Sequence, residues 1–178
     1  MIELSPIQTK FILHWGEMGT RWGINRTVAQ IHALLYLSEE PLNAEQIAET
    51  LTVARSNVSN SLKELQGWGL IKNVHRLGDR RDHFESKKDM WEMARLITAE
   101  RKRREFDPTV VVLRECIDEI DSTGGGSEYT RERVAATLKF IESATDVYEQ
   151  LQSLPVETIM KVATTKKRLK SLIKSLTG

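Results

Sequence analysis

Polar side chains of the kinds that hydrogen-bond to DNA bases are concentrated between residues 55 and 63. The major groove of DNA admits a helix, and arginine, lysine, asparagine and serine side chains can contact base edges there. Serine and asparagine are poor helix formers, so four of them within residues 56–60 indicate a role other than helix stability. The predicted contact residues are Arg55, Ser56, Asn57, Ser59, Asn60 and Lys63. An ordinary solvent-facing helix surface is the alternative interpretation.

A second basic group surrounds a glycine some twenty residues further on. Its members are Arg76, Arg80 and Arg81. We expect residues 78–82 to form the tip of a hairpin, where two adjacent arginines suit contact with phosphates or with the minor groove. Asp79 and Asp82 flank that pair and are expected to orient the guanidinium groups by charge-assisted hydrogen bonds. An ordinary polar hairpin is the alternative.

Two short helices must position the first group. Asn43 is a good N-cap for the first helix, and Glu45 lies in its first turn, where the helix dipole favours negative charge. The second helix begins at Ala54 or just after it, and Ala54 has no side-chain oxygen for a cap, a loss of about 1 kcal/mol unless Thr52 substitutes. Its apolar positions, four and three residues apart, share one face: Val58, Leu62 and Leu65.

A mixed apolar and polar strand follows at residues 70–75, and residues 83–85 return from the turn. The predicted fold is therefore mainly α: a winged helix-turn-helix DNA-binding domain with a small two- to three-stranded antiparallel sheet, plus a helical dimerisation region. The distribution of charged residues along the chain supports a DNA-binding segment. Residues 54–88 carry eight basic and four acidic side chains, residues 1–53 three and six, and residues 89–178 fifteen of each. The positive excess is confined to the segment proposed to contact DNA.

This stretch resembles the MarR superfamily of winged-helix regulators, and more closely its GbsR-like branch. The resemblance rests on residues 55–65, 68–71, 78–82 and 84–91, and it is weaker outside residues 27–91. It implies a two-fold dimer that binds double-stranded DNA at an inverted-repeat operator, with half-sites about 34–36 Å apart, and a repressor as the default. It also implies a small-molecule effector, with choline or glycine betaine as candidates.

Helical patterns flank the DNA-binding segment. We expect helices at 6–22 and 27–37 before it, and at 88–106, 110–120, 131–153 and 157–176 after it. Asp107-Pro108 should break the chain and start a new helix, and residues 122–127 should form a flexible loop. Three regions follow: an N-terminal helix that joins the dimerisation region (1–26), the winged helix-turn-helix domain (27–91) and a helical dimerisation and possible effector-binding region (92–178).

The last predicted helix has apolar residues at alternating spacings of three and four, as in a coiled coil. A stripe this narrow favours a homodimer interface. Its apolar members are Ile159, Val162, Leu169, Ile173 and Leu176, with Lys166 among them.

Several aromatic residues are expected near a hinge between the DNA-binding domain and the dimerisation region. Quaternary ammonium ligands are bound in aromatic cages, so a possible effector cage consists of Trp15, Trp22, Tyr36 and Trp91, with Phe11 nearby. Core and interface packing is the more common role of such residues.

Other functions find little support in the sequence. We identify no paired carboxylates, catalytic constellation or cofactor motif, so we expect neither an enzyme nor a cofactor. His75 and His83, which can face each other across the hairpin, lack a third metal ligand. The lone Cys116 is expected to be buried, with a redox sensor as the alternative. The longest uncharged run, residues 27–38, is too short for a membrane span, and the N-terminus lacks a signal sequence, which predicts a cytoplasmic protein. A protein-binding winged helix is the remaining rival.

Overall fold

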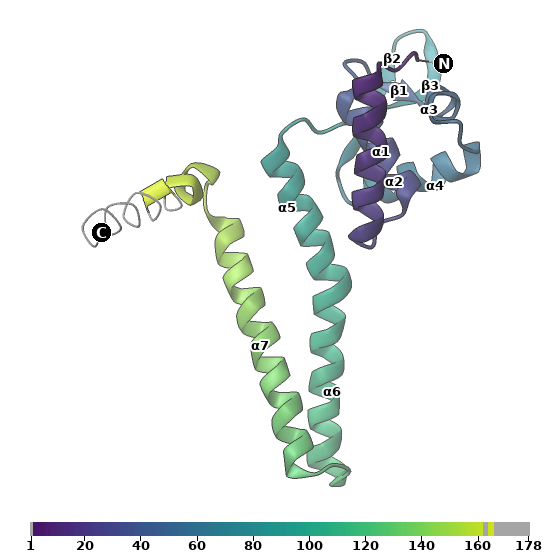
Figure 1. Cartoon of the computed structure of the whole chain (residues 1–178). Coiled ribbons are helices and arrows are strands. Elements are labelled where there is room, and N and C mark those ends of the chain that lie inside the picture. Colours follow the sequence, from purple (N-terminus) through teal and green to yellow (C-terminus); the bar gives the residue numbers. More distant parts are fainter. Residues whose placement is uncertain (1, 162–163, 166–178) are drawn as a thin grey trace. The chain divides into compact units, whose positions relative to one another are not determined.

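The structure is a computed structural model that describes residues 2–161, 164 and 165. The chain forms two compact units, Met1–Ile97 and Thr98–Gly178 (Figure 1). The first unit therefore takes in the N-terminal helix as well as residues 27–91. Within the described residues, no helix is long and apolar enough to cross a membrane.

Two helices open the first unit, α1 (Pro6–Arg21) and α2 (Arg26–Leu37). Ser5 caps α1 in a capping box: its hydroxyl accepts from the Gln8 backbone N–H at 3.2 Å, and the Ser5 N–H donates to Gln8 Oε1 at 2.9 Å. The helices approach closely, since a Cβ added to Gly19 would lie 2.5 Å from the Cβ of Ala29. A glycine is required at that contact.

The helix-turn-helix consists of α3 (Ala44–Leu51) and α4 (Arg55–Gly67), and both helices are confirmed as predicted. The Asn43 side chain accepts from the backbone N–H groups of Glu45 and Gln46 at 3.1 and 3.0 Å. Thr52 ends α3 in the left-handed region, at φ 54°, which is unfavourable for a β-branched residue. No side chain caps the N-terminus of α4, so Thr52 does not replace the oxygen that Ala54 lacks.

The wing is a three-stranded antiparallel sheet in the order β1-β3-β2, formed by β1 (Leu42–Asn43), β3 (Asp79–Ser86) and β2 (Ile71–Arg76). Asn43 pairs with His83, and Val74 pairs with His83 from the other side. The short strand β1 thus joins the start of α3 to the wing. This is a winged helix fold, as predicted.

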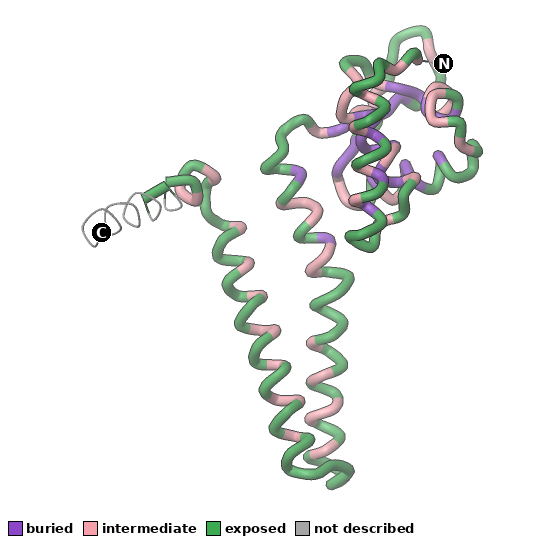
Figure 2. Tube along the Cα trace, viewed as in Figure 1, coloured by how far each residue is buried: buried purple, intermediate pink, exposed green. Residues whose placement is uncertain are grey.

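The core of the first unit lies between α2, α3, α4 and the base of the wing. Ile31, Leu34, Ile47, Val58 and Leu65 are almost completely buried, and Met93 of α5 (Met90–Arg101) belongs to the same cluster. Figure 2 shows the concentration of buried positions in this unit. The apolar stripe predicted for α4 is therefore the face that holds the helix in place.

In the second unit, the predicted break at Asp107-Pro108 is wrong. The chain stays helical from α5 through a π-helical turn, η1 (Lys102–Phe106), into α6 (Asp107–Thr123). Asp107 has helical backbone angles, and its N–H bonds to the carbonyl of Lys102, five residues back. A proline ring clashes with the carbonyl four residues before it in an α-helix, and the wider π turn next to Pro108 accommodates the ring.

Helix α6 ends at Gly124, in the left-handed conformation (φ 67°), and α7 (Glu128–Ser153) follows, capped by the Ser127 hydroxyl. Neither α6 nor α7 contains a buried residue, although a half-buried stripe runs along each. Cys116 lies in that stripe and is half-buried rather than buried. Residues 156–161 are helical, with Ile159 half-buried. Outside the described residues lie Val162, Lys166, Leu169, Ile173 and Leu176.

Candidate nucleic-acid interface

The polar residues of α4 do not share a single face. Successive residues of a helix are rotated by about 100°, so Arg55, Ser59 and Lys63 fall on the wing side of α4. Ser56 and Asn60 follow around the helix toward the opposite flank. Asn57 lies on the opposite flank, toward the start of α2. There Asn57 and Asn60 line a shallow hollow of about 220 Å³ beside Asn25 and Thr27. All six predicted contact residues are exposed.

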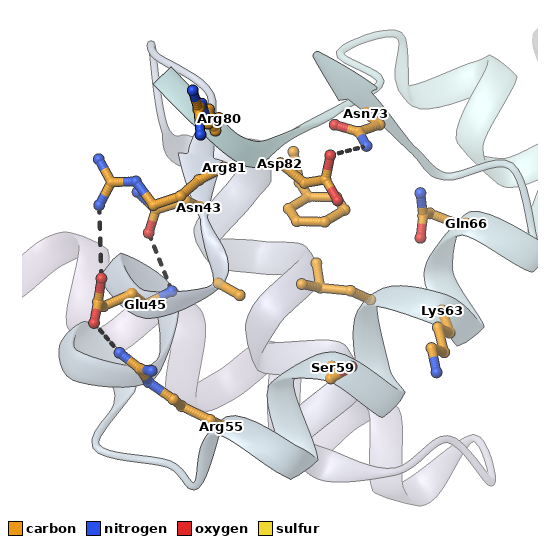
Figure 3. Close-up of a pocket in the computed structure, with 13 residues that line it drawn as sticks. Asn43, Glu45, Arg55, Ser59, Lys63, Gln66, Asn73, Arg80, Arg81 and Asp82 are labelled. Carbon is orange, nitrogen blue, oxygen red and sulfur yellow. Dashed lines mark hydrogen bonds and ion pairs between the residues drawn. The ribbon is translucent and has the colours of Figure 1, made fainter. Parts of the chain in front are cut away.

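A groove of about 630 Å³ separates α4 from the wing (Figure 3). Of the predicted residues, it is lined by Arg55, Ser59, Lys63, Arg80 and Arg81. The structure thus brings together one side of the recognition helix and two wing arginines. Asn57, Ser56, Asn60 and Arg76 are outside this lining.

Several groove residues were not predicted as DNA contacts, among them Glu45, Gln66 and Asn73. Gln66 is one turn beyond Lys63 on α4, and Asn73 is exposed on β2. The Asn73 amide donates to Asp82 Oδ1 at 2.8 Å across the strand pair. Asp82 therefore accepts from Asn73, and the expectation that it orients an arginine is wrong. Gln66 continues the wing-side row of Arg55 and Ser59, a spacing that could have identified it.

Asp79 holds Arg81, as predicted. The Arg81 Nε lies 2.9 Å and its Nη2 2.6 Å from the Asp79 carboxylate oxygens, and its backbone N–H donates to the same group at 3.0 Å. These hydrogen bonds hold the pKa of the Asp79 carboxyl well below its usual range, and the same pair raises the pKa of Arg81. The carboxylate thus remains charged and fixes the direction of the guanidinium group.

Arg80 and Arg81 lie within β3, not at the tip of the wing. The two-residue turn is Leu77–Gly78, where Arg76 pairs with Asp79 and Gly78 adopts φ 85°. Glycine adopts that conformation without steric cost, so it fixes the turn two residues earlier than the charge pattern indicates. Leu77 is fully exposed at the tip, and Arg76 pairs with Glu40.

His75 and His83 do not face each other. His83 is buried and pairs with Val74, with its Nδ1 3.0 Å from the Arg81 carbonyl oxygen, whereas His75 is exposed. Among the residues that the structure describes, no group of three potential metal ligands is present.

The four aromatic residues of the predicted cage do not surround one space. Trp15 and Trp22 meet edge to face at 6.3 Å, and with Trp68 they line a cavity of about 30 Å³, room for about one water molecule. Tyr36 instead stacks on Phe11 at 6.4 Å, and Trp91 is 50% exposed.

The same cavity is lined by His32, which is buried and whose Nε2 has no hydrogen-bond partner among the described residues. Burial, with a smaller contribution from the charge of Lys88, lowers the pKa of His32 to about 4. The ring is therefore neutral near pH 7.

Fold and groove together define a winged helix-turn-helix protein with a polar surface between helix and wing. A family model described as the MarR family matches residues 22–82, from just before α2 into β3. The chain is thus similar to that family over the helix-turn-helix and the wing.

Three solved structures are similar to the chain. A crystal structure described as a transcriptional regulator matches 83% of this chain and 96% of its own, at 15% identity and a TM-score of 0.62. MepR of Staphylococcus aureus, solved as a DNA complex, matches 80% of this chain and 99% of its own, at 20% identity and a TM-score of 0.38. The regulator Tm0710 of Thermotoga maritima matches 83% and 92%, at 17% identity and 0.39. The first match shows a shared fold. No curated protein matched the chain.

Proposed function

We propose that the protein is a sequence-specific DNA-binding transcriptional regulator without catalytic activity. The observation that carries this proposal is the groove between α4 and the wing, where Arg55, Ser59 and Lys63 of the helix face Arg80 and Arg81 of β3. A helix in the major groove with an adjacent basic wing supplies base contacts and phosphate contacts together. The match to the MarR family model over these elements supports the same function.

We further propose a homodimer on an inverted repeat. Helices α6 and α7 contain no buried residue, and their exposed apolar side chains include Val111, Val112, Phe140 and Val147. Isolated helices are marginal in water, so a second copy that covers these side chains would stabilise the unit. Of the dimerisation residues predicted from the sequence, Ile159 lies within the described residues and is half-buried. A dimer on its operator would block transcription, which favours a repressor.

A small-molecule effector is a further part of the proposal. The second unit contains an apolar hollow of about 210 Å³ lined by Phe106, Ala144 and Tyr148, with Arg101 and Lys102 also in its lining. The resemblance of the sequence to the GbsR-like branch makes choline and glycine betaine the first compounds to test. Titration calorimetry that records no heat with either compound would remove them as candidates.

The test of DNA binding is fluorescence anisotropy with a duplex from the gene's upstream region and with a scrambled duplex, across salt concentrations. We expect tight, salt-sensitive binding to the first duplex, because counterions are released from phosphates. Arg80→Ala should weaken binding to both duplexes and lower the salt slope by about 1. Lys63→Ala, on the helix side of the groove, should relax discrimination by about 1–3 kcal/mol. Lys139→Ala, an exposed site on α7, is the charge control.

Equal affinity for the two duplexes would contradict specific regulation. Absence of binding at any salt concentration would favour the rival function, a protein-binding winged helix, for which the fully exposed Leu77 at the wing tip is the supporting observation. The exposed face of α4 is polar, which favours DNA.

A further inference from the structure

One carboxylate connects the recognition helix to the wing. Glu45 Oε1 pairs with the guanidinium group of Arg55, the first residue of α4, and Glu45 Oε2 lies 3.6 Å from Arg81 Nη1 of β3. Each carboxylate oxygen thus pairs with one arginine. The two arginines belong to α4 and β3, the two elements proposed to contact DNA (Figure 3).

The position of Glu45 is set independently of these arginines. Glu45 lies in the first turn of α3, where the helix dipole favours a negative charge. Its backbone N–H donates to Asn43 Oδ1 at 3.1 Å, and Asn43 pairs with His83 in the sheet. The backbone of Glu45 is therefore fixed by α3 and β1, and its carboxylate reaches both arginines from that fixed point.

Arg81 is held between two carboxylates. Asp79 binds its Nε and Nη2 on one side, and Glu45 approaches its Nη1 on the other. The side chain of Arg81 nevertheless remains 58% exposed, and that of Arg55 70%. Both groups are thus oriented while still accessible to a ligand in the groove.

A carboxylate on a DNA-binding surface opposes phosphate and weakens electrostatic binding to any sequence. It improves discrimination when it orders the arginines before DNA arrives, because less side-chain entropy is then lost on binding, and when its charge disfavours poorly matched DNA. Glu45 lines the groove and pairs with both arginines, which is the arrangement that the first condition requires.

We propose that Glu45 is a positioning residue that fixes the spacing between Arg55 and Arg81 and thereby increases selection of the operator over other DNA. This inference rests on the proposed DNA-binding function. The carboxylate lowers affinity for unrelated sequences and preserves affinity for the one sequence whose groups fit both oriented arginines.

The test compares wild type, Glu45→Gln and Glu49→Gln by anisotropy with operator and scrambled duplexes across salt concentrations. Glu49 is exposed on α3 and does not line the groove, so its substitution removes the same charge from the same helix. We expect Glu45→Gln to bind scrambled DNA more tightly and with a steeper salt dependence. We also expect its operator-to-scrambled affinity ratio to fall about tenfold, the size of one charge-assisted hydrogen bond. Glu49→Gln should leave the ratio unchanged.

A double-mutant cycle separates positioning from charge alone. In an Arg81→Ala background, Glu45→Gln should change the affinity ratio less than in wild type, because the two side chains act together. Thermal unfolding should show that Glu45→Gln remains folded, since the Asn43–Gln46 capping box does not use the Glu45 side chain.

Each contrary result has a distinct meaning. An unchanged ratio in Glu45→Gln, with wild type discriminating normally, overturns the positioning role alone, as does equal weakening on both duplexes. Wild-type protein that binds neither duplex, or binds both equally, contradicts the proposed function, and the positioning role falls with it.

Discussion

Lys88 Nζ donates a 2.7 Å hydrogen bond to the backbone carbonyl of Tyr36 and lies 5.7 Å from the centre of the same residue's ring. It also donates to the carbonyls of Leu35 at 3.0 Å and Ser38 at 2.7 Å. The last carbonyls of a helix lack partners within the helix, and a cation is favoured there. Lys88 follows β3, so it attaches the end of the wing to the end of α2.

Lys88→Met should therefore lower the free energy of unfolding by about 1–3 kcal/mol, since carbonyls that accept from a charged donor would lose it. Chemical denaturation checks this. Lys87→Met is the matched control: Lys87 forms a surface ion pair with Glu92 at 2.5 Å, and such pairs contribute about 0–1 kcal/mol. Equal losses in the two variants would show that Lys88 does not cap α2.

Two glycine substitutions should have opposite effects. Gly19→Ala should destabilise the protein by about 1–3 kcal/mol, because its Cβ would lie 2.5 Å from the Cβ of Ala29 and the helices would have to separate. Gly67→Ala meets nothing within 4 Å and should stabilise α4 by about 1 kcal/mol through helix propensity. Thermal and denaturant unfolding of both variants would measure the difference, and a stabilising Gly19→Ala would contradict the close α1–α2 contact.

His32 should make the protein sensitive to mild acid. Burial lowers its folded-state pKa to about 4 from an ordinary 6.5, so below pH 6.5 the unfolded state binds a proton that the folded state does not. This contribution to stability is complete above about pH 6.5 and falls as the pH drops toward 4, by about 2 kcal/mol at pH 5. His32→Phe should reduce the loss between pH 7 and pH 5 by that amount in denaturant titrations.

The control for His32 is His14→Phe, at an exposed position on α1. His32→Phe should also be no less stable at pH 7, because it removes a buried nitrogen without a partner. An unchanged pH dependence in His32→Phe would show that the ring is accessible to water.

Asp79 acts at lower pH. Its hydrogen bonds with Arg81 depress its folded-state pKa, so its contribution to stability is present above the ordinary aspartate pKa of about 4 and is lost as the pH falls below that value. Asp79→Asn should lose less stability than wild type on acidification from pH 5 to pH 2. Asp82→Asn, which removes a carboxylate from the same strand without disturbing the Arg81 pair, is the charge control. Denaturant unfolding of all three proteins across this pH range measures the loss of stability. An equal loss in wild type and Asp79→Asn would contradict the contribution of Asp79.

Local rules predicted much of this structure. The Asn43 side-chain oxygen marks a helix start, and the spacing of Val58, Leu62 and Leu65 identifies the buried face of α4, because each depends on residues within one or two turns. The exposed polar residues of α4 follow from the same periodicity.

What was missed depends on contacts between distant residues. The hairpin tip follows from strand register and from the positive φ of Gly78, whereas the sequence shows only a cluster of charges. The partner of Asp82 lies across the sheet, and the bridge from Glu45 to Arg55 and Arg81 requires three elements to meet. Sequence spacing cannot place side chains from separate elements beside one another.

The π-helical turn η1 changes how the sequence around it should be counted. A turn that bonds to the fifth residue back holds about one residue more than an α-helical turn, so Lys102–Phe106 acts as a one-residue insertion in an otherwise regular helix. The apolar repeat of α6, which includes Leu113, Cys116 and Ile120, is therefore out of phase with any repeat counted forward from α5. An alignment or heptad assignment that crosses residues 102–106 must step by one residue there.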